Sequence, residues 1–421
     1  MTELPHPTRT VCPTCLRKVP AVLSGPPDAV LLEGDCPEHG VWRTPVWNGT
    51  PSYDLWCAGA DTTAADQVCT ALVEVTQRCD LGCPVCFAEA GPRAEPDPPL
   101  SLLKDMLAGV FDSAGAVNLQ LSGGEPTLRE DLPQIAQMAA DIGFTFIQLN
   151  TNGIRLGEET GYAEELRASG VDSVFLQFDG LDDRTYRVLR GRPLRETKLR
   201  TLERCAQAGL AVVLVPTIVP GVNDGEIGAL VRFAASWPGV VRGLHFQPIS
   251  YFGRHPFEDL RHLTMPEMLR MIEAQTEGEV RADDFAPSCC EHVRCSFRAR
   301  YWVREGGRLE RLQAARSCCS PRTEEPARRA VAATARQWSA GANTAPARVG
   351  SSNGATDGLT LFLQQAERSL TISGMLFQDA WNVDWERIDR CCVRVATPDH
   401  RLVSFCLWNL TGATGERLHP R

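Results

Sequence analysis

The sequence lacks three features that would tie a protein to a membrane or to nucleic acid. It has no run of 18 or more apolar residues, so no membrane-spanning helix is predicted. Its start, MTELPHPTRT, has no basic segment followed by an apolar one, so we expect no secretion signal and a cytoplasmic location. It has no excess of positive charge either. Its 43 basic and 52 acidic residues give a net charge of −9, which argues against nucleic acid and anionic membranes as partners.

What is present is a globular chain that is rich in thiols. Forty-three per cent of its 421 residues are hydrophobic, which is ordinary for a protein with a full core in one large domain or a few smaller ones. Among its 17 cysteines, fourteen fall in three groups, at 12–36, 79–86 and 289–406. In a cytoplasmic chain, clustered thiols bind metal more often than they form disulfides. We therefore expect metal sites in all three regions.

The middle group lacks a fourth thiol nearby. Cys79, Cys83 and Cys86 are spaced Cys-x3-Cys-x2-Cys in the stretch CDLGCPVC. Thiolates this close can wrap one iron–sulfur cube from a single loop, and three ligands leave one iron free to bind a small molecule. We take these three cysteines as the catalytic metal ligands. The alternatives are a buried trio of thiols and a zinc knuckle completed from elsewhere.

Strand and helix patterns alternate after residue 70. The strand patterns are 71–76, 116–124, 145–153, 173–180, 211–221 and 244–250, and the helical ones about 100–112, 128–142, 160–169, 195–209 and 225–237. Two Thr-x-x-Glu sequences, at 127–130 and 264–267, predict capping boxes at helix starts. Strands that alternate with helices form a parallel sheet. The predicted fold class is α/β, with a partial (β/α)6 barrel like a TIM barrel over 70–255.

Polar or glycine-rich residues follow each predicted strand, at the sheet edge where ligands bind in such folds. Gly123 and Gly124 allow close backbone approach, and Glu125 can accept a hydrogen bond from an ammonium group. Gln177 and Asp179 suit ribose hydroxyls, or an internal hydrogen-bond network. Either His245 or Gln247 faces the cavity, or both are satisfied core residues. Asn152 and Val219 end two further strands.

The first 58 residues carry two metal-binding knuckles. Cys12-x2-Cys15 and Cys36-x2-His39 have the spacing of a tetrahedral zinc or rubredoxin-like iron site, and Cys57 could replace His39. We predict a rubredoxin- or zinc-ribbon-like domain over 1–58 with one mononuclear zinc or iron ion.

The C-terminal part carries eight cysteines, the number that two four-thiolate cubes would use. We favour Cys290, Cys295 and Cys392 as ligands, then Cys406 and Cys319, because adjacent thiolates rarely bind the same cluster. The alternative is a cysteine-rich subdomain without a metal. We predict an auxiliary iron–sulfur region over 256–319 and 358–421, separated by a linker or mobile insert at 320–357 that is rich in Ala, Arg, Ser and Gly.

The stretch CDLGCPVCF resembles the radical S-adenosylmethionine (SAM) enzymes. The resemblance implies one 4Fe-4S cluster whose free iron is chelated by SAM, and cleavage of SAM to a 5′-deoxyadenosyl radical that abstracts hydrogen. It implies that Gly123, Gly124 and Glu125 contact the SAM amino group. It also implies that Asn152 lies near the ribose or the carboxylate of SAM, and that Val219 contacts the adenine. A small electron donor, such as ferredoxin or flavodoxin, would reduce the cluster.

The order of motifs along the chain is similar to that of the tetraether lipid synthase and dihydropterin methylase group. That group implies one or two auxiliary 4Fe-4S clusters besides the rubredoxin-like site. This chain departs from it at Glu291, where we expect proline, so the register of that auxiliary site is open.

The group divides by reaction. Some members join lipid alkyl chains, and others transfer a one-carbon unit from a reduced folate to a pterin-like ring. We predict methylation or another C–C bond-forming step on a soluble pterin-like or natural-product substrate. The absence of a basic amphipathic helix weakens the alternative, coupling of lipid chains. A non-catalytic electron-transfer protein is a remote alternative.

Overall fold

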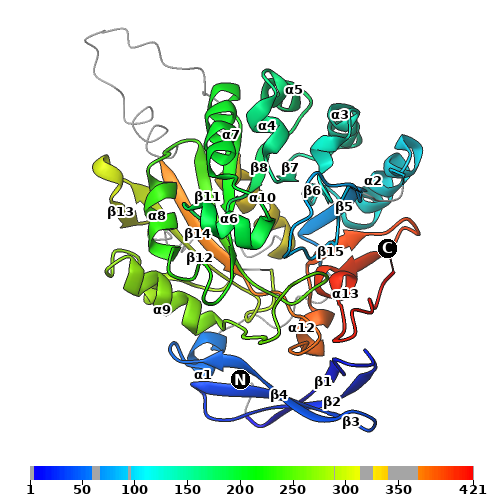
Figure 1. Ribbon diagram of the computed structural model, residues 1–421, viewed down its shortest axis with the longest axis vertical. Coiled ribbons are helices and arrows are strands. Elements are labelled where there is room, and N and C mark those ends of the chain that lie inside the picture. The colour runs from blue at the N-terminus through cyan, green and yellow to red at the C-terminus, as the bar shows by residue number, and fades with distance from the viewer. Residues whose placement is uncertain are drawn as a thin grey trace.

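A computed structural model describes residues 4–58, 67–92, 96–288, 290–312, 326–339 and 368–420. The N-terminal part is a four-stranded antiparallel sheet in the order β1-β2-β3-β4, which lies at one end of the molecule (Figure 1). Its strands are β1 His6–Val11, β2 Lys18–Ser24, β3 Ala29–Cys36 and β4 Gly40–Asn48, followed by helix α1 Tyr53–Cys57. The two knuckles lie between β1 and β2 and between β3 and β4.

The main body is built on a second, larger sheet. Its six central strands are parallel and lie side by side in chain order: β5 Thr70–Thr76, β6 Asn118–Gly123, β7 Ile147–Thr151, β8 Ser173–Gln177, β9 Ala211–Val215 and β11 Val241–Pro248. A short strand, β10 Thr217–Ile218, pairs with β11. These six strands confirm the predicted partial barrel.

The C-terminal residues extend this sheet at both ends, which the sequence did not predict. Strand β14 Ser369–Met375 pairs with β11 in parallel, and β15 Val393–Ala396 pairs with β5 in parallel. Antiparallel strands β12 Ser296–Val303, β13 Leu309–Arg311 and β16 Leu402–Ser404 lie outside these. The auxiliary region is therefore part of the same sheet as the barrel.

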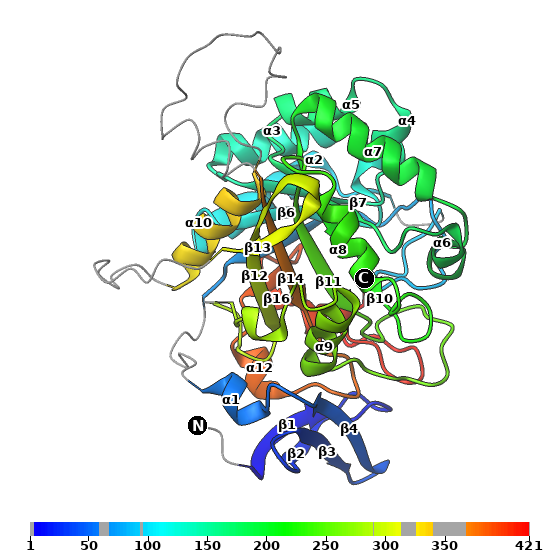
Figure 2. The same ribbon diagram turned by 90° about the vertical axis from the view of Figure 1, so that its left-hand side faces the viewer.

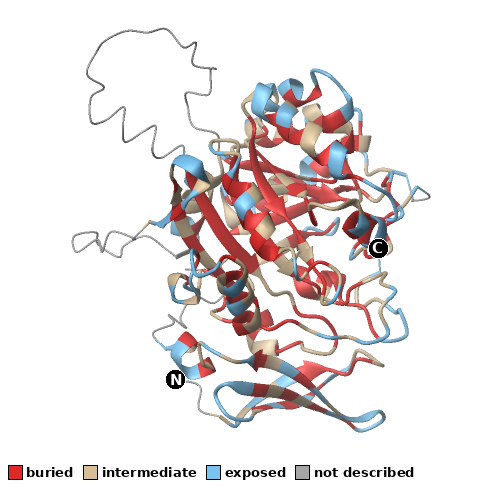
Figure 3. Ribbon diagram, turned by 60° about the vertical axis from the view of Figure 1, so that its left-hand side comes forward, coloured by how far each residue is buried: buried red, intermediate tan, exposed pale blue. Residues whose placement is uncertain are grey.

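Helices cover the outer face of the sheet. They are α2 Leu100–Ala114, α3 Leu132–Ile142, α4 Ile154–Glu158, α5 Tyr162–Ala168, α6 Asp183–Arg190, α7 Arg195–Ala208, α8 Ile227–Ala235 and α9 Met265–Gln275. Short 3-10 helices lie at η1 Pro126–Leu128, η2 Ala282–Asp284 and η3 Glu305–Gly307. Leu119, Leu149 and Leu214 of the strands are fully buried against helix residues such as Leu103 and Leu202. The helices turn their buried faces to the sheet and their exposed faces outward, as expected of amphipathic segments (Figure 3).

One predicted capping box is present and one is not. At α9, Thr264 and Glu267 form the box. The Thr127–Glu130 box is wrong, because α3 begins only at Leu132. Pro133 explains the difference, since it has no N–H to give an earlier turn and its ring would clash with the carbonyl of residue 129.

Helix α10 Pro326–Trp338 lies on the inner face of the sheet, against β6, β9 and β11 (Figure 2). It falls inside the stretch predicted as a linker, and the rest of 320–357 apart from Ser339 lies outside the described residues. Trp338 packs on Phe175 and His245, at ring-centroid distances of 6.0 Å each. Gly243 leaves room for this indole, because a Cβ there would lie 2.9 Å from Trp338 Nε1.

Helices α12 Trp385–Asp389 and α13 Phe405–Asn409 close the side of the body next to the N-terminal sheet. Thr8 Oγ1 donates to Asp384 Oδ1 at 2.7 Å, and Lys18 Nζ lies 3.5 Å from the centroid of the Trp385 ring. The N-terminal sheet is thus packed on the C-terminal residues. In the described part of the chain, no helix is both long enough and apolar enough to cross a membrane.

Candidate active site and metal centres

A cavity of about 270 Å³ lies on the inner face of the barrel. The three-cysteine loop lines it at the carboxyl ends of the strands, and α10 lines its opposite side. Between them the strands contribute polar side chains, among them Gln120, Asn150, Gln177, His245 and Gln247. Parallel strands usually bury apolar residues on both faces, so this polar inner face marks a binding chamber.

Cys79, Cys83 and Cys86 all line this cavity, directly after β5. Burial raises the pKa of the Cys79 and Cys83 thiols. Buried thiols resist ionisation unless a cation lies beside them, and a metal cluster supplies that positive charge. These three thiols fit a cluster held from one loop.

Neighbouring elements hold the loop in place. Cys86 N donates to Arg254 O at 2.9 Å, and Arg254 Nε donates to Cys83 O at 2.7 Å. Arg190, at the end of α6, donates from Nη1 to Val85 O at 2.9 Å. The loop is therefore fixed from two sides.

The Gly-Gly-Glu turn packs tightly on the beginning of the same loop. A Cβ on Gly123 would lie 2.1 Å from Thr76 O, and one on Gly124 would lie 2.2 Å from Arg78 O, so both positions require glycine. Glu125 is 1% exposed and accepts from Thr151 Oγ1 and from Asn152 N, both at 2.7 Å. These hydrogen bonds lower the pKa of Glu125, but burial outweighs them and raises it above its ordinary value.

A buried lysine, which the sequence analysis missed, lies behind two of the predicted SAM contacts. Lys198 Nζ donates to Asn152 O, and to Gln177 Oε1 at 3.2 Å. It is fully buried, which lowers its pKa to about 8. Asn152 itself donates from Nδ2 to Asp80 Oδ1 at 2.7 Å, next to Cys79. The signal for Lys198 was its position on the buried face of its helix, with Leu202 and Cys205.

Asp179 lies behind the cavity wall. Its carboxylate accepts from Arg190 Nε at 2.7 Å, from Arg190 Nη2 at 2.8 Å and from Thr217 N at 3.1 Å. Burial disfavours the guanidinium charge, but Asp179 outweighs it and raises the pKa of Arg190. Arg190 lines the cavity, whereas Asp179 and the buried Val219 are not among its lining residues. Asp179 thus holds Arg190 in place, and its contact with a ribose stays a prediction.

Both candidates on the sixth strand line the cavity. His245 hydrogen-bonds through Nδ1 with Ser373 Oγ at 2.9 Å, and burial lowers its pKa to about 4. The imidazole is therefore neutral at pH 7. Gln247 lies one step nearer the three-cysteine loop.

The N-terminal knuckles come together as the sequence predicted. The ligand atoms of Cys12, Cys15, Cys36 and His39 lie within 4.8 Å of one another, and Cys57 lies elsewhere, in α1. A hydrogen bond from Arg17 lowers the pKa of Cys15, and a backbone N–H of Glu38 lowers that of Cys36. Three thiols and one imidazole at this spacing fit a tetrahedral zinc or iron ion.

A second group joins Cys69, Cys290, Glu291 and Cys392, whose ligand atoms also lie within 4.8 Å of one another. Cys69 Sγ is 3.0 Å and Cys290 Sγ is 3.4 Å from Cys392 Sγ. Cys69 was not among the predicted ligands, because no other cysteine lies within nine residues of it in the chain.

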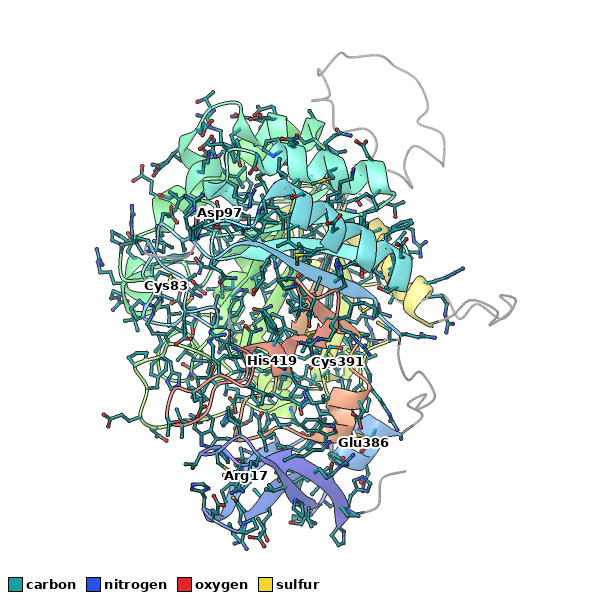
Figure 4. All side chains as sticks on the ribbon, turned by 90° about the vertical axis from the view of Figure 1, so that its right-hand side faces the viewer. Arg17, Cys83, Asp97, Glu386, Cys391 and His419 are labelled. Atoms are coloured by element: carbon teal, nitrogen blue, oxygen red, sulfur yellow. The ribbon has the colours of Figure 1, made fainter. Side chains whose placement is uncertain are left out.

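Three other late cysteines, Cys295, Cys391 and Cys406, influence one another electrostatically, but among the described residues they are not gathered within 4.8 Å like the two groups above. Burial and the charge of Cys295 raise the pKa of Cys391 to about 11. Burial also raises the pKa of Cys406, and the charges of Cys391 and Cys295 add to this effect. Arg387 Nε donates to Cys295 Sγ and Gln378 N to Cys406 Sγ, both at 3.3 Å. Cys319 lies outside the described residues. Figure 4 shows Cys83, Cys391 and Arg17, beside Cys15, in three different parts of the molecule.

The comparisons with known proteins agree with this arrangement. Residues 73–234 match the radical SAM superfamily, and residues 4–48 match the HMPTM N-terminal zinc ribbon domain. The 7,8-dihydro-6-hydroxymethylpterin dimethyltransferase of Methanocaldococcus jannaschii is 31% identical, over 96% of this chain and 93% of the relative. A probable GTP 3′,8-cyclase of Archaeoglobus fulgidus is 34% identical, over 44% of this chain and 63% of its own length. A crystal structure of Streptococcus suis SuiB superposes with a TM-score of 0.43 and 17% identity, over 51% of this chain and 47% of that one.

The near full-length match to the dimethyltransferase carries the assignment, and the zinc ribbon agrees with it. It confirms the predicted radical SAM chemistry with its two cofactors, a 4Fe-4S cluster and SAM. The chain belongs to the radical SAM superfamily and, within it, to the family of the 7,8-dihydro-6-hydroxymethylpterin dimethyltransferase.

Proposed function

We propose that this protein methylates, or otherwise forms a C–C bond on, a small polar heterocycle of the pterin type. The observation that carries the proposal is the shared chamber. Three cysteines that fit a radical cluster and a polar inner barrel wall line the same cavity. A relative similar over nearly its whole length is named for dimethylation of a dihydropterin, which supports this substrate class.

The lining favours a heterocycle over a lipid chain. Gln120, Asn150, Gln247 and Arg298 offer amide and guanidinium groups that match the ring nitrogens and carbonyl oxygens of a pterin. Gln120 and Asn150 already hydrogen-bond to each other, but the buried Asn150 Oδ1 has no hydrogen-bond partner among the described residues, and an alkyl chain could not supply one. The apolar residues of helix α9 pack on α8 and β4, outside the barrel, and none of them lines the chamber.

The residues of the chamber have separable roles. When bound, the reduced 4Fe-4S cluster and SAM supply a 5′-deoxyadenosyl radical for hydrogen abstraction. Cys79, Cys83 and Cys86 would hold the cluster, and Glu125 would accept from the SAM ammonium. His245, neutral at pH 7, can hydrogen-bond to a substrate without placing a charge near the radical. Trp338 and α10 exclude water from the inner side of the chamber.

The reaction also requires electrons from outside the chain. We propose a one-electron donor such as ferredoxin or flavodoxin, and a cytoplasmic setting. The 14 cysteines in the described ranges are all free, which agrees with a reducing compartment.

The test is anaerobic turnover of the reconstituted protein with SAM and dithionite. We expect 5′-deoxyadenosine, and methylated product when 7,8-dihydro-6-hydroxymethylpterin is added together with a reduced folate that carries the one-carbon unit. Cys83→Ala should abolish both, whereas Cys57→Ala, which removes a thiol far from the chamber, should retain both. Absence of 5′-deoxyadenosine would refute the radical chemistry. Its formation only with phospholipid would refute the heterocycle.

A further inference from the structure

The inner face of the sheet carries two arginines on β12, at the end of the chamber away from the three-cysteine loop. Across β11, β14 and β12, the register places His245, Ser373 and Arg298 in one row, and all three line the cavity. The next row, further from the three-cysteine loop, contains Thr371 and Arg300. Side chains two residues apart on a strand point to the same face, so Arg300 faces the same side as Arg298.

Helix α10 covers this second row. Thr371 Oγ1 donates to Gln337 Oε1 at 3.5 Å, and Arg336 is the preceding residue of the helix. Burial, and then the positive charges of Arg298 and Arg336, lower the pKa of Arg300. Arg300 is therefore close enough to two other guanidinium groups to be repelled by both.

Arg300 lacks the partners that a buried guanidinium group needs. Its Nε is buried and has no hydrogen-bond partner in the described ranges, and no carboxylate of those ranges offsets the two positive charges that act on it. Arg304, just after the same strand, is paired with Glu310 at 2.8 Å. A buried charge is costly without a counter-ion, and the planar fork of a guanidinium group matches the oxygens of a carboxylate or a phosphate. The site at Arg300 thus suits an anionic ligand.

We propose that Arg300 and Arg336 bind an oxyanion, a carboxylate or a phosphate, at the end of a tail carried by a heterocycle in the chamber. The length of the chamber favours a tail. Gln247 lies four residues along β11 from Gly243, which shares its row with Arg300, and a strand rises about 3.3 Å per residue, so about 13 Å separates the two rows. A bicyclic ring held at Gln247 does not reach Arg300 by itself.

This inference rests on the proposed function in one respect, namely that the ring in the chamber is the heterocycle of that reaction or its one-carbon donor. Two sources supply an oxyanion on such a ring. A reduced folate ends in glutamate carboxylates, and a dihydropterin phosphorylated on its hydroxymethyl group ends in a phosphate. Both present the same chemistry to a guanidinium group, and the test distinguishes them.

The test is anaerobic equilibrium dialysis with the reconstituted full-length protein, without SAM or reductant, so that no turnover occurs. The probes are tetrahydrofolate, 7,8-dihydro-6-hydroxymethylpterin monophosphate and 6-methyltetrahydropterin, which has the ring without an anionic tail. Arg300→Gln should raise the Kd of one charged probe about ten- to a hundredfold, and Arg336→Gln, at an exposed position, about two- to fivefold. Both variants should leave the Kd of 6-methyltetrahydropterin unchanged. Arg304→Gln is the matched control and should change none of the three.

The charged probe that is weakened identifies the source of the oxyanion. If Arg300→Gln does not fold, as judged by circular dichroism, Arg300→Lys takes its place and should raise the Kd of the same probe, because it loses the fork of the guanidinium group. Unchanged affinity for both charged probes in the Arg300 and Arg336 variants, or equal weakening of the ring without a tail, would overturn the proposal. Failure here leaves the 5′-deoxyadenosine and methylation assays of the proposed function unaffected, so the two failures are distinguishable.

Discussion

Replacing Asp179 by asparagine should release the three-cysteine loop. Asp179 is fully buried, and its two oxygens accept three hydrogen bonds, two from Arg190 and one from Thr217 N. Arg190 in turn donates to Val85 O, between Cys83 and Cys86. The asparagine keeps the shape of the side chain but leaves the guanidinium charge buried without its counter-ion.

The expected magnitude follows from that geometry. Breaking a buried ion pair by removing one partner costs about 3–5 kcal/mol. Arg190 retains two acceptors, Val85 O at 2.9 Å and Thr217 Oγ1 at 3.0 Å, so we expect the lower end of this range. A loss of about 3 kcal/mol corresponds to roughly a hundredfold increase in local opening.

Hydrogen–deuterium exchange of the loop and of α6 measures this opening directly. The informative amide is Val85 N, which donates to Leu189 O at 3.3 Å. Glu196→Gln is the matched control, because it removes an exposed ion pair to Arg200 and should change exchange by well under tenfold. The double variant Asp179→Asn/Arg190→Gln should recover part of the protection, since no unpaired charge remains. Unchanged exchange in Asp179→Asn, or a double variant as open as the sum of the singles, would refute the reasoning.

Three further predictions concern the other parts of the site. The folded-state pKa of His245, about 4, lies below its ordinary value of about 6.5, so the free energy of unfolding falls as pH drops through this window. Between pH 7 and pH 5, His245→Gln should therefore lose about 2 kcal/mol less unfolding free energy than the parent, measured by denaturant unfolding at both pH values. Gly124→Ala should lower both cluster iron and SAM affinity, measured by iron analysis and equilibrium dialysis, because its Cβ would lie 2.2 Å from Arg78 O; Gly82→Ala, with nothing within 4 Å of its Cβ, should leave both unchanged. Cys12→Ala should lose the metal of the N-terminal site and melt at lower temperature but cleave SAM normally per folded molecule; equal loss of cleavage in a stably folded variant would contradict this division of roles.

The central barrel was predictable because its signals are local. Short windows of sequence contain the alternating pattern of the strands, the amphipathic pattern of the helices and the closely spaced Cys79, Cys83 and Cys86. The additions to the sheet were not predictable in this way. Strand β14 pairs with β11 across a separation of more than 100 residues, and a period-two pattern identifies a strand without naming its partner.

The missed site residues share a physical cause. Charged side chains are exposed by default, so Lys198 and Arg190 read as surface positions on their helices. Both are buried because acceptors that come from other segments surround them: Asn152 O and Gln177 for Lys198, and Asp179 for Arg190. Cys69 was missed for the same reason, since its thiol neighbours come from far along the chain.

The cysteine doublet at 391–392 shows how the structure answers what spacing left open. Adjacent thiols seemed a surplus, because two neighbouring residues rarely bind the same cluster. Cys392 points to Cys69 and Cys290, whereas the charge that acts most strongly on Cys391 is that of Cys295, ahead of Cys69. Successive side chains of an extended segment leave on opposite sides, and this doublet leads directly into β15. The two thiols of the doublet therefore have different surroundings: Cys392 belongs to the group of Cys69, Cys290 and Glu291, and Cys391 does not.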